Sequence, residues 1–206
     1  MILAVDTSLG TAVALIDVDG TVRAEAAASD PLGHAEVIGD LLERALVEAG
    51  EGEITHVVTG MGPGPFTGLR IGIAAARAFA LARGVPVIPV PSHLAAALTV
   101  AAGDAGTPFA IVTDARRREV ALTVFDGVDD DGIPRVSADT VLVRATEADA
   151  HLQGIRRIDV AEVSGVALAR VGAMALRAGR RLGDDEPLYM RHPDAAAPTL
   201  PKRVGT

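Results

Sequence analysis

A glycine- and proline-rich segment between an apolar strand pattern and a long apolar helix constrains this chain more than any other feature. Residues 60–70 read GMGPGPFTGLR, after the apolar run 54–58 and before the helical pattern 69–83, for which Thr67 is an N-cap candidate. A strand, a glycine loop and a helix start can hold an anion, because backbone N–H groups and the helix dipole converge there. The same glycines could instead serve only close packing of the helix on a sheet. The sequence pattern is compatible with both interpretations.

Composition indicates an ordinary globular protein without disulfides. Apolar residues make up 49% of the 206 residues and aromatic residues only 2%, so Ala, Val, Leu and Ile must build the core. With no cysteine, neither a disulfide framework nor a thiolate metal site can form. A formal net charge of -8 argues against nucleic-acid binding by the chain alone, because phosphate contacts need a basic face. The N-terminus enters a strand pattern without a signal peptide's basic region, so we expect a cytoplasmic protein with no membrane contact.

The hydrophobic pattern predicts an α/β fold. Three antiparallel strands open the chain, and a parallel crossover unit and a further helix follow them. The predicted strands are 1–6, 11–17, 21–28, 54–59 and 85–90, and the predicted helices are 34–49 and 69–83.

The opening pattern repeats after a hinge expected at 103–107. A strand over 110–114 ends in aspartate, as the strand over 1–6 does, and the strand 119–126 follows it. The two hairpins lie about 108 positions apart, which indicates two related half-domains. A third strand and a long helix complete a shorter second half, at 136–143 and 161–182. The predicted units are a lobe at 1–103, a reduced lobe at 104–183 and an extended tail at 184–206.

Two lobes that each open with a β-hairpin resemble the actin-like ATPase and sugar kinase superfamily, in which nucleotide phosphates lie between the hairpins of the two lobes. Three segments narrow the resemblance to one family within this superfamily. They are ILAVDTS at 2–8, the segment 60–70 followed by Ile71 and Gly72, and YMR at 189–191 with Pro193 and Asp194. Together they resemble the bacterial TsaB family, also called YeaZ and once grouped with the glycoproteases. The resemblance runs over nearly the whole chain, although residues 143–162 look abbreviated.

This resemblance implies a role in making threonylcarbamoyladenosine beside the anticodon of tRNAs that read codons beginning with A. It implies a non-catalytic subunit that pairs with the paralogous transferase, TsaD, while an ATPase subunit, TsaE, binds the pair. Contact with tRNA is then expected only through the complex, and the isolated chain is expected to form a homodimer. The alternative is a small ATP-binding phosphotransferase of the sugar kinase superfamily. A glycoprotease is the least favoured reading.

The metal ligands of the transferase are missing from the matching positions. In that paralogue two histidines four residues apart follow a Val-Pro-x-Ile-x-Val strand, which places both imidazoles on one helical face. Here the strand is 85–90, and the matching positions are Ser92 and Ala96. His93 has alanine four residues on, so we expect a capping or packing role for it. No residue is assigned as catalytic or as a metal ligand.

The nucleotide site is predicted to be degenerate. Asp6 could organise Mg²⁺ through water or could simply cap a tight turn. In the second lobe Arg116, Arg117 and Arg118 replace a small glycine-rich turn and would fill the space that phosphate needs. These arginines are candidate anion contacts for a partner or tRNA, or a solvated turn. No tightly bound cofactor is expected, and ATP or ADP with Mg²⁺ is placed at the complex interface. The vestigial phosphate contacts are Asp6, Thr7, Ser8, Gly10, Thr11, Gly62, Gly64 and Thr67.

Two helices carry more apolar surface than one sheet face can cover. The helices 34–49 and 69–83 could form a four-helix interface with a second subunit, or both could be buried in a monomer. Stable pairing would need to bury on the order of 1,200 Å². The predicted interface residues are His34, Val37, Leu41, Leu42, Arg70, Ile73, Ala74, Arg77 and Phe79.

Overall fold

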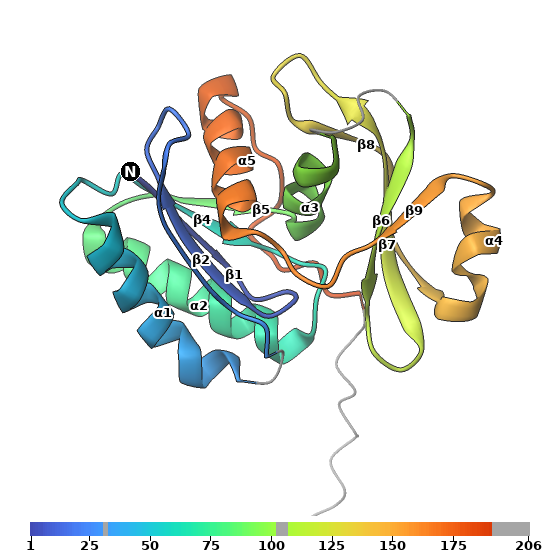
Figure 1. Cartoon of the computed structure of the whole chain (residues 1–206), viewed down its shortest axis with the longest axis horizontal. Helices are drawn as coiled ribbons and strands as arrows, with labels where there is room; N and C mark the ends of the chain where they lie inside the picture. The colour runs from blue at the N-terminus through green and yellow to red at the C-terminus, as the bar shows by residue number, and fades with distance from the viewer. Residues whose placement is uncertain (31–32, 102–106, 191–206) are drawn as a thin grey trace, which may run out of the picture.

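The computed structural model describes residues 1–30, 33–101 and 107–190 and contains two mixed β-sheets (Figure 1). The strands are β1 Ile2–Asp6, β2 Thr11–Ile16, β3 Val22–Ala28, β4 His56–Gly60, β5 Val87–Val90, β6 Phe109–Asp114, β7 Glu119–Val128, β8 Pro134–Arg144 and β9 Arg156–Asp159. The first sheet has the order β3-β2-β1-β4-β5 and the second the order β8-β7-β6-β9. The predicted two-lobed α/β fold with a smaller second sheet is confirmed.

The helices separate into an outer pair and an inner pair. They are α1 His34–Ala49, α2 Phe66–Arg83, α3 Ser92–Ala101, the short α4 Ala148–Leu152 and α5 Gly165–Ala178, with a 3₁₀ turn, η1, at Ala145–Glu147. The outer pair, α1 and α2, covers one face of the first sheet, and α3 and α5 lie between the two sheets (Figure 1). Because helices cover both its faces, β1 is buried along its whole length.

Each lobe opens with the same hairpin. In the first hairpin Asp6 pairs with Ala12, and at the matching place in the second hairpin Asp114 pairs with Val120. Each leading strand also pairs in parallel with a later strand, β1 with β4 and β6 with β9. The repeat predicted from the sequence is therefore present in strand register.

One continuous hydrophobic core joins the two lobes. It contains Ile2 and Val58 from the first sheet, Phe109 and Phe125 from the second, and the buried faces of α3 and α5. Although α5 follows the second sheet in sequence, it packs on β1 and β2 of the first. A side chain at Gly172 of α5 would overlap Val58, so this helix lies close against the sheet.

Several local predictions need correction. The N-cap prediction for Thr67 is wrong, because α2 begins at Phe66 and the extended residue Pro65 occupies the N-cap position. The helix predicted at 161–182 spans only 165–178. Residues 143–162 contain α4 and β9, which the sequence pattern did not indicate. The predicted hinge lies almost entirely outside the described residues, as do residues 191–206 of the predicted tail.

Candidate functional site

Asp6 at the end of β1 is buried, and both of its carboxylate oxygens accept hydrogen bonds from within the chain. Its Oδ1 accepts hydrogen bonds from the backbone N–H of Ser8 at 2.8 Å and from the Ser8 hydroxyl at 2.6 Å. Its Oδ2 accepts from the Ser92 hydroxyl at 2.5 Å, and Ser92 Oγ in turn accepts from the Gly62 N–H at 3.1 Å. Only 2% of Asp6 is exposed. Burial raises the pKa of the Asp6 carboxyl, and the hydrogen bonds from Ser8 and Ser92 oppose that rise.

The glycine loop between β4 and α2 lies directly on this hairpin. A Cβ at Gly60 would overlap the Asp6 carboxylate, and one at Gly64 would lie 2.8 Å from Ser8 Cα. Gly10, at φ 101°, likewise has the Ala28 carbonyl 2.8 Å from the place of a Cβ. The glycines here permit close approach of backbone segments, which is the packing interpretation of the loop.

The residues of the first hairpin therefore do not fit a magnesium-bound nucleotide. The Thr7 hydroxyl donates to the Gly68 carbonyl at 2.8 Å, and Thr11 Oγ1 lies 2.9 Å from His34 Nδ1. Both hydroxyls are buried, as are Ser8 and Asp6. Phosphate oxygens would have to displace these internal bonds, so we derive no chemistry through a nucleotide at this position.

Helix α3 has packing contacts at the positions that match the metal ligands of the transferase. Ser92 is bonded to Asp6, and Ala96 is buried in the core. His93 Nδ1 lies 2.7 Å from Thr123 Oγ1 and its Nε2 lies 3.0 Å from Thr113 Oγ1, so His93 connects α3 to β6 and β7 as a packing residue. Burial lowers the pKa of His93 to about 3, so the ring is neutral. Among the described residues, no three His, Cys, Asp or Glu side chains are grouped to hold a metal ion.

The second hairpin has an unusual turn. Arg116, Arg117 and Arg118 all have positive φ, at 66°, 55° and 64°. Left-handed backbone costs non-glycine residues about 1 kcal/mol or more each. The turn is fastened by the Asp114 carboxylate, which accepts from the Arg116 N–H at 2.9 Å, and by the Glu119 N–H, which donates to the Arg116 carbonyl at 3.0 Å. The three arginine side chains are exposed.

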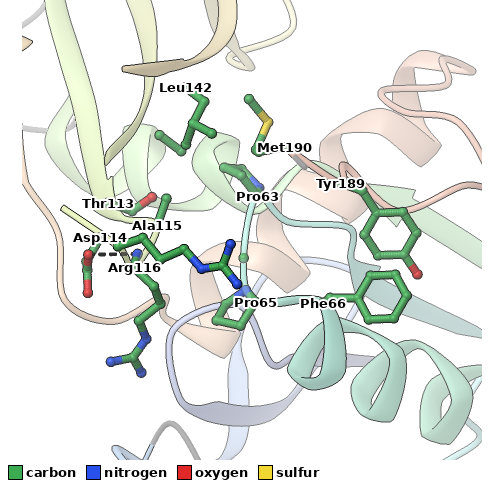
Figure 2. A pocket seen from close by; sticks show the side chains of 13 residues that line it. Pro63, Pro65, Phe66, Thr113, Asp114, Ala115, Arg116, Leu142, Tyr189 and Met190 are labelled. Atoms are coloured by element: carbon green, nitrogen blue, oxygen red, sulfur yellow. Dashed lines mark hydrogen bonds between the residues drawn. The ribbon is translucent and has the colours of Figure 1, made fainter. Parts of the chain in front are cut away.

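A cavity of about 320 Å³ lies between this turn, the glycine loop and residues 189–190. Figure 2 shows Phe66 and Tyr189 on one side of it and Thr113, Asp114 and Arg116 on the other. Its described lining consists of Pro63, Gly64, Pro65, Phe66, Thr113, Asp114, Ala115, Arg116, Arg117, Ala121, Leu142, Tyr189 and Met190.

The first hairpin lines a different cavity. That cavity measures about 480 Å³ and includes Asp6, Gly10 and Thr11 together with Glu25, Glu162 and α3. The two hairpins thus line different cavities, whereas the superfamily resemblance implies one nucleotide site shared by both.

Residues 183–190 form a strap across α2 and the glycine loop. The Leu188 N–H donates to the Met61 carbonyl at 2.8 Å. Arg70 Nε donates to the Tyr189 hydroxyl at 2.9 Å, and its guanidinium lies 3.6 Å from the centre of the Phe66 ring. Arg77 donates to the Asp185 carbonyl. This part of the predicted extended tail is therefore packed, and Arg70 and Arg77 contact the strap.

The predicted interface residues divide by exposure. Three of them, His34, Leu41 and Ile73, are buried within the chain. The structure places Arg70, Ala74 and Arg77 in solvent and leaves Val37, Leu42 and Phe79 half-buried. The same helices also carry Leu81, 85% exposed, and Val47, 76% exposed, which are not among the predicted interface residues.

Two mixed sheets, each opened by a hairpin and joined through inner helices, define a two-lobed α/β protein. YeaZ from Pseudomonas aeruginosa shares this fold, with a TM-score of 0.74 and 21% identity over 91% of this chain and 98% of that one. The sequence profile of the family described as TsaD, tRNA N6-adenosine threonylcarbamoyltransferase, matches residues 24–166. The chain belongs to this family. These matches agree with the resemblance to the TsaB (YeaZ) family.

Two relatives show how the family match is distributed. An uncharacterised protein of Mycobacterium tuberculosis is 34% identical over 94% of this chain and 93% of its own length. The tRNA N6-adenosine threonylcarbamoyltransferase of Streptococcus pneumoniae is also 34% identical, over 73% of this chain but only 40% of that protein. None of the helices in the described part of the chain is long and apolar enough to cross a membrane.

Proposed function

We propose that this chain is a non-catalytic subunit of the machinery that makes threonylcarbamoyladenosine in tRNA, and that it binds and activates a paralogous TsaD-type transferase. The family match supports a role in tRNA modification. The observation that supports a non-catalytic role is the hydrogen bond from Ser92 to Asp6. Where the resemblance places a metal-binding histidine of the transferase, this chain has a short hydroxyl side chain that closes the site.

The outer face of α1 and α2 is the surface that we assign to the partner. Ala74 and Ala78 are small and exposed, which lets a second helix approach closely, and Leu81 and Val47 expose apolar surface at the C-terminal ends of the two helices. The isolated chain would pair with itself through this face and with the transferase in the cell. A TsaE-type ATPase would bind the pair, tRNA would be reached through the complex, and ATP or ADP with Mg²⁺ would bind at the shared surface. The proposed location is the cytoplasm.

Reconstitution tests the catalytic part of the proposal. The purified chain is incubated with tRNA and threonylcarbamoyl-adenylate, and modified adenosine is measured. We expect no product from the chain alone and restored turnover when the cognate transferase and ATPase are added. Product formed by the isolated chain would overturn the non-catalytic assignment.

A matched pair of variants tests the surface. Ala74→Glu places a charge on the exposed face of α2, whereas Ala150→Glu places the same charge at an exposed position of helix α4 in the second lobe. Burying an unpaired carboxylate is costly, so we expect Ala74→Glu to weaken pairing at least tenfold in analytical ultracentrifugation and Ala150→Glu to leave it unchanged. Equal pairing by the two variants would remove α2 from the interface.

The phosphotransferase alternative receives no support from the first hairpin. It requires a carboxylate that can reach magnesium and phosphate, and the oxygens of the buried Asp6 carboxylate already accept hydrogen bonds from Ser8 and Ser92. Tight Mg-ATP binding that Asp6→Ala abolishes would be needed to restore it.

A further inference from the structure

The cavity beside the arginine turn has the composition of a small-ligand site. Most of its wall is apolar, including Pro65, Tyr189 and Met190, and two arginines, Arg116 and Arg117, line one side. Binding sites for small molecules typically combine an apolar wall with a few placed polar groups and measure roughly 300–1,000 Å³. At about 320 Å³ the cavity lies at the lower limit, so it suits a ligand of modest size.

Both walls of the cavity are held in place before any ligand arrives. The arginine turn is fastened by the Asp114 carboxylate and by the hydrogen bond from the Ala115 N–H to the Glu119 carbonyl at 2.9 Å. On the other side, Tyr189 is held by Arg70 and by ring contact with Phe66, at 4.7 Å between centroids. Walls that need no ordering on binding lower its entropic cost.

We propose that this cavity binds one nucleoside monophosphate unit, with the phosphate at Arg116 and Arg117 and the base against Tyr189 and Met190. Guanidinium groups match phosphate oxygens in geometry and charge, and flat aromatic and apolar side chains are the usual support for an unstacked base. The cavity volume and the neighbouring Asp114 carboxylate disfavour a triphosphate. This cavity lies apart from the one that Asp6 lines.

The nucleoside monophosphate unit could belong to either of two ligands, an RNA strand or a free mononucleotide. The RNA source rests on the proposed function, since the partner RNA would then be tRNA. In that case the arginine turn is this chain's own contact with the substrate of the complex.

The single tyrosine of the chain reports on the cavity. The chain has one tyrosine and no tryptophan, and that tyrosine is Tyr189 in the cavity wall. AMP is titrated into the isolated protein while the Tyr189 ring protons are followed by NMR. We expect saturable shifts with AMP, at least tenfold weaker binding of adenosine, and the same weakening of AMP binding in Arg116→Gln and Arg117→Gln.

Arg118 supplies the matched control. It stands in the same turn with the same sign of φ, but among the described residues the cavity is lined by Arg116 and Arg117 and not by Arg118. Arg118→Gln should therefore bind AMP as the unchanged chain does. Met190→Ala, which leaves the turn intact, should weaken AMP while leaving any response to inorganic phosphate unchanged.

Three results would overturn the proposal. The first is that about 10 mM AMP causes no shift of the Tyr189 signals. The others are that all three arginine variants lose AMP binding equally, or that a tetraglutamate peptide causes the same shifts as AMP. Added tRNA separates the sources. If tRNA competes with AMP and Arg116→Gln weakens that competition, the natural ligand is a nucleotide of RNA. If tRNA leaves the AMP shifts unchanged, the ligand is a free nucleotide. Either result supports nucleotide binding in the cavity. AMP binding is measured without the transferase, so the two proposals can fail separately. A chain that binds AMP but does not activate the transferase would refute only the proposed function. A chain that activates the transferase but does not bind AMP would refute only this inference.

Discussion

His93 is a neutral imidazole in the core that two threonine hydroxyls hold from opposite sides. Thr123 Oγ1 also lies 2.8 Å from Thr140 Oγ1, which extends the polar chain from α3 through β7 to β8. A buried group with partners on both nitrogens fixes the position of the helix against the second sheet. The same arrangement makes the protein sensitive to acid.

The pH dependence of stability should carry the signature of His93. Burial lowers its pKa from 6.5 to about 3. Between these values the unfolded chain binds a proton that the folded chain does not, so the free energy of unfolding falls as the pH falls, by about 1.4 kcal/mol per pH unit. Urea unfolding at pH 6.5 and 5.0 measures this slope. His93→Gln should remove the contribution of His93 to this slope, whereas His151→Gln, at an exposed position, should leave the slope unchanged.

If His93→Gln and the unchanged chain lost stability in parallel over this interval, the imidazole would have to be protonated in the folded protein. The Asp6 carboxyl contributes in the opposite direction. Its folded pKa is raised, so its contribution to stability is fully present below 3.8 and is lost as the pH rises through the folded value.

Helix α2 depends on a glycine for its distance from the sheet. A Cβ at Gly72 would overlap Thr7, and the Thr7 hydroxyl is already bonded to the Gly68 carbonyl. We expect Gly72→Ala to lower the free energy of unfolding by about 2 kcal/mol through overpacking, despite the better helix propensity of alanine. Adding Thr7→Ala should recover part of the loss.

Gly39 in α1 is the matched control for this substitution. It has no neighbour within 4 Å of an added Cβ. Gly39→Ala should raise the free energy of unfolding by about 0.5–1 kcal/mol through propensity alone. Equal urea midpoints for the two alanine variants would show that α2 can move away from Thr7 at little cost.

The long elements were predictable because each carries its own periodic pattern. The apolar positions of α1 recur at helical spacing, and both hairpins show strand patterns interrupted by turn residues. Strand β9 is only four residues long and reads RRID, and α4 is five residues long, so neither offers enough period to detect. Thr67 resembled an N-cap because local pattern cannot show that the chain enters the helix earlier, at Pro65.

The candidate site was predictable in its residues more than in its arrangement. The Asp6 hairpin and the arginine turn stand out locally, but Ser92 reaches Asp6 from 86 residues away. The docking of Tyr189 on Phe66 and Arg70 is equally a product of tertiary packing. No local pattern could show that the two hairpins line separate cavities.

The two lobes should unfold as one unit. Their shared core through α3 and α5, the His93 contacts, and the ion pairs of Arg180 with Asp129 and Asp131 at 2.5 and 2.9 Å all join them. Urea transitions followed by Tyr189 fluorescence and by far-UV circular dichroism should therefore coincide. Two separated transitions would show that the lobes unfold independently.

The packing of α5 on the first sheet also affects how the chain folds during its synthesis. The sheet formed by β1 to β5 is complete in sequence by Val90, yet the helix that covers its inner face begins only at Gly165. At a translation rate of about 5–20 residues per second, the inner apolar face of that sheet would stay uncovered for several seconds. The nascent first lobe is thus a natural client for chaperones until the last helix emerges.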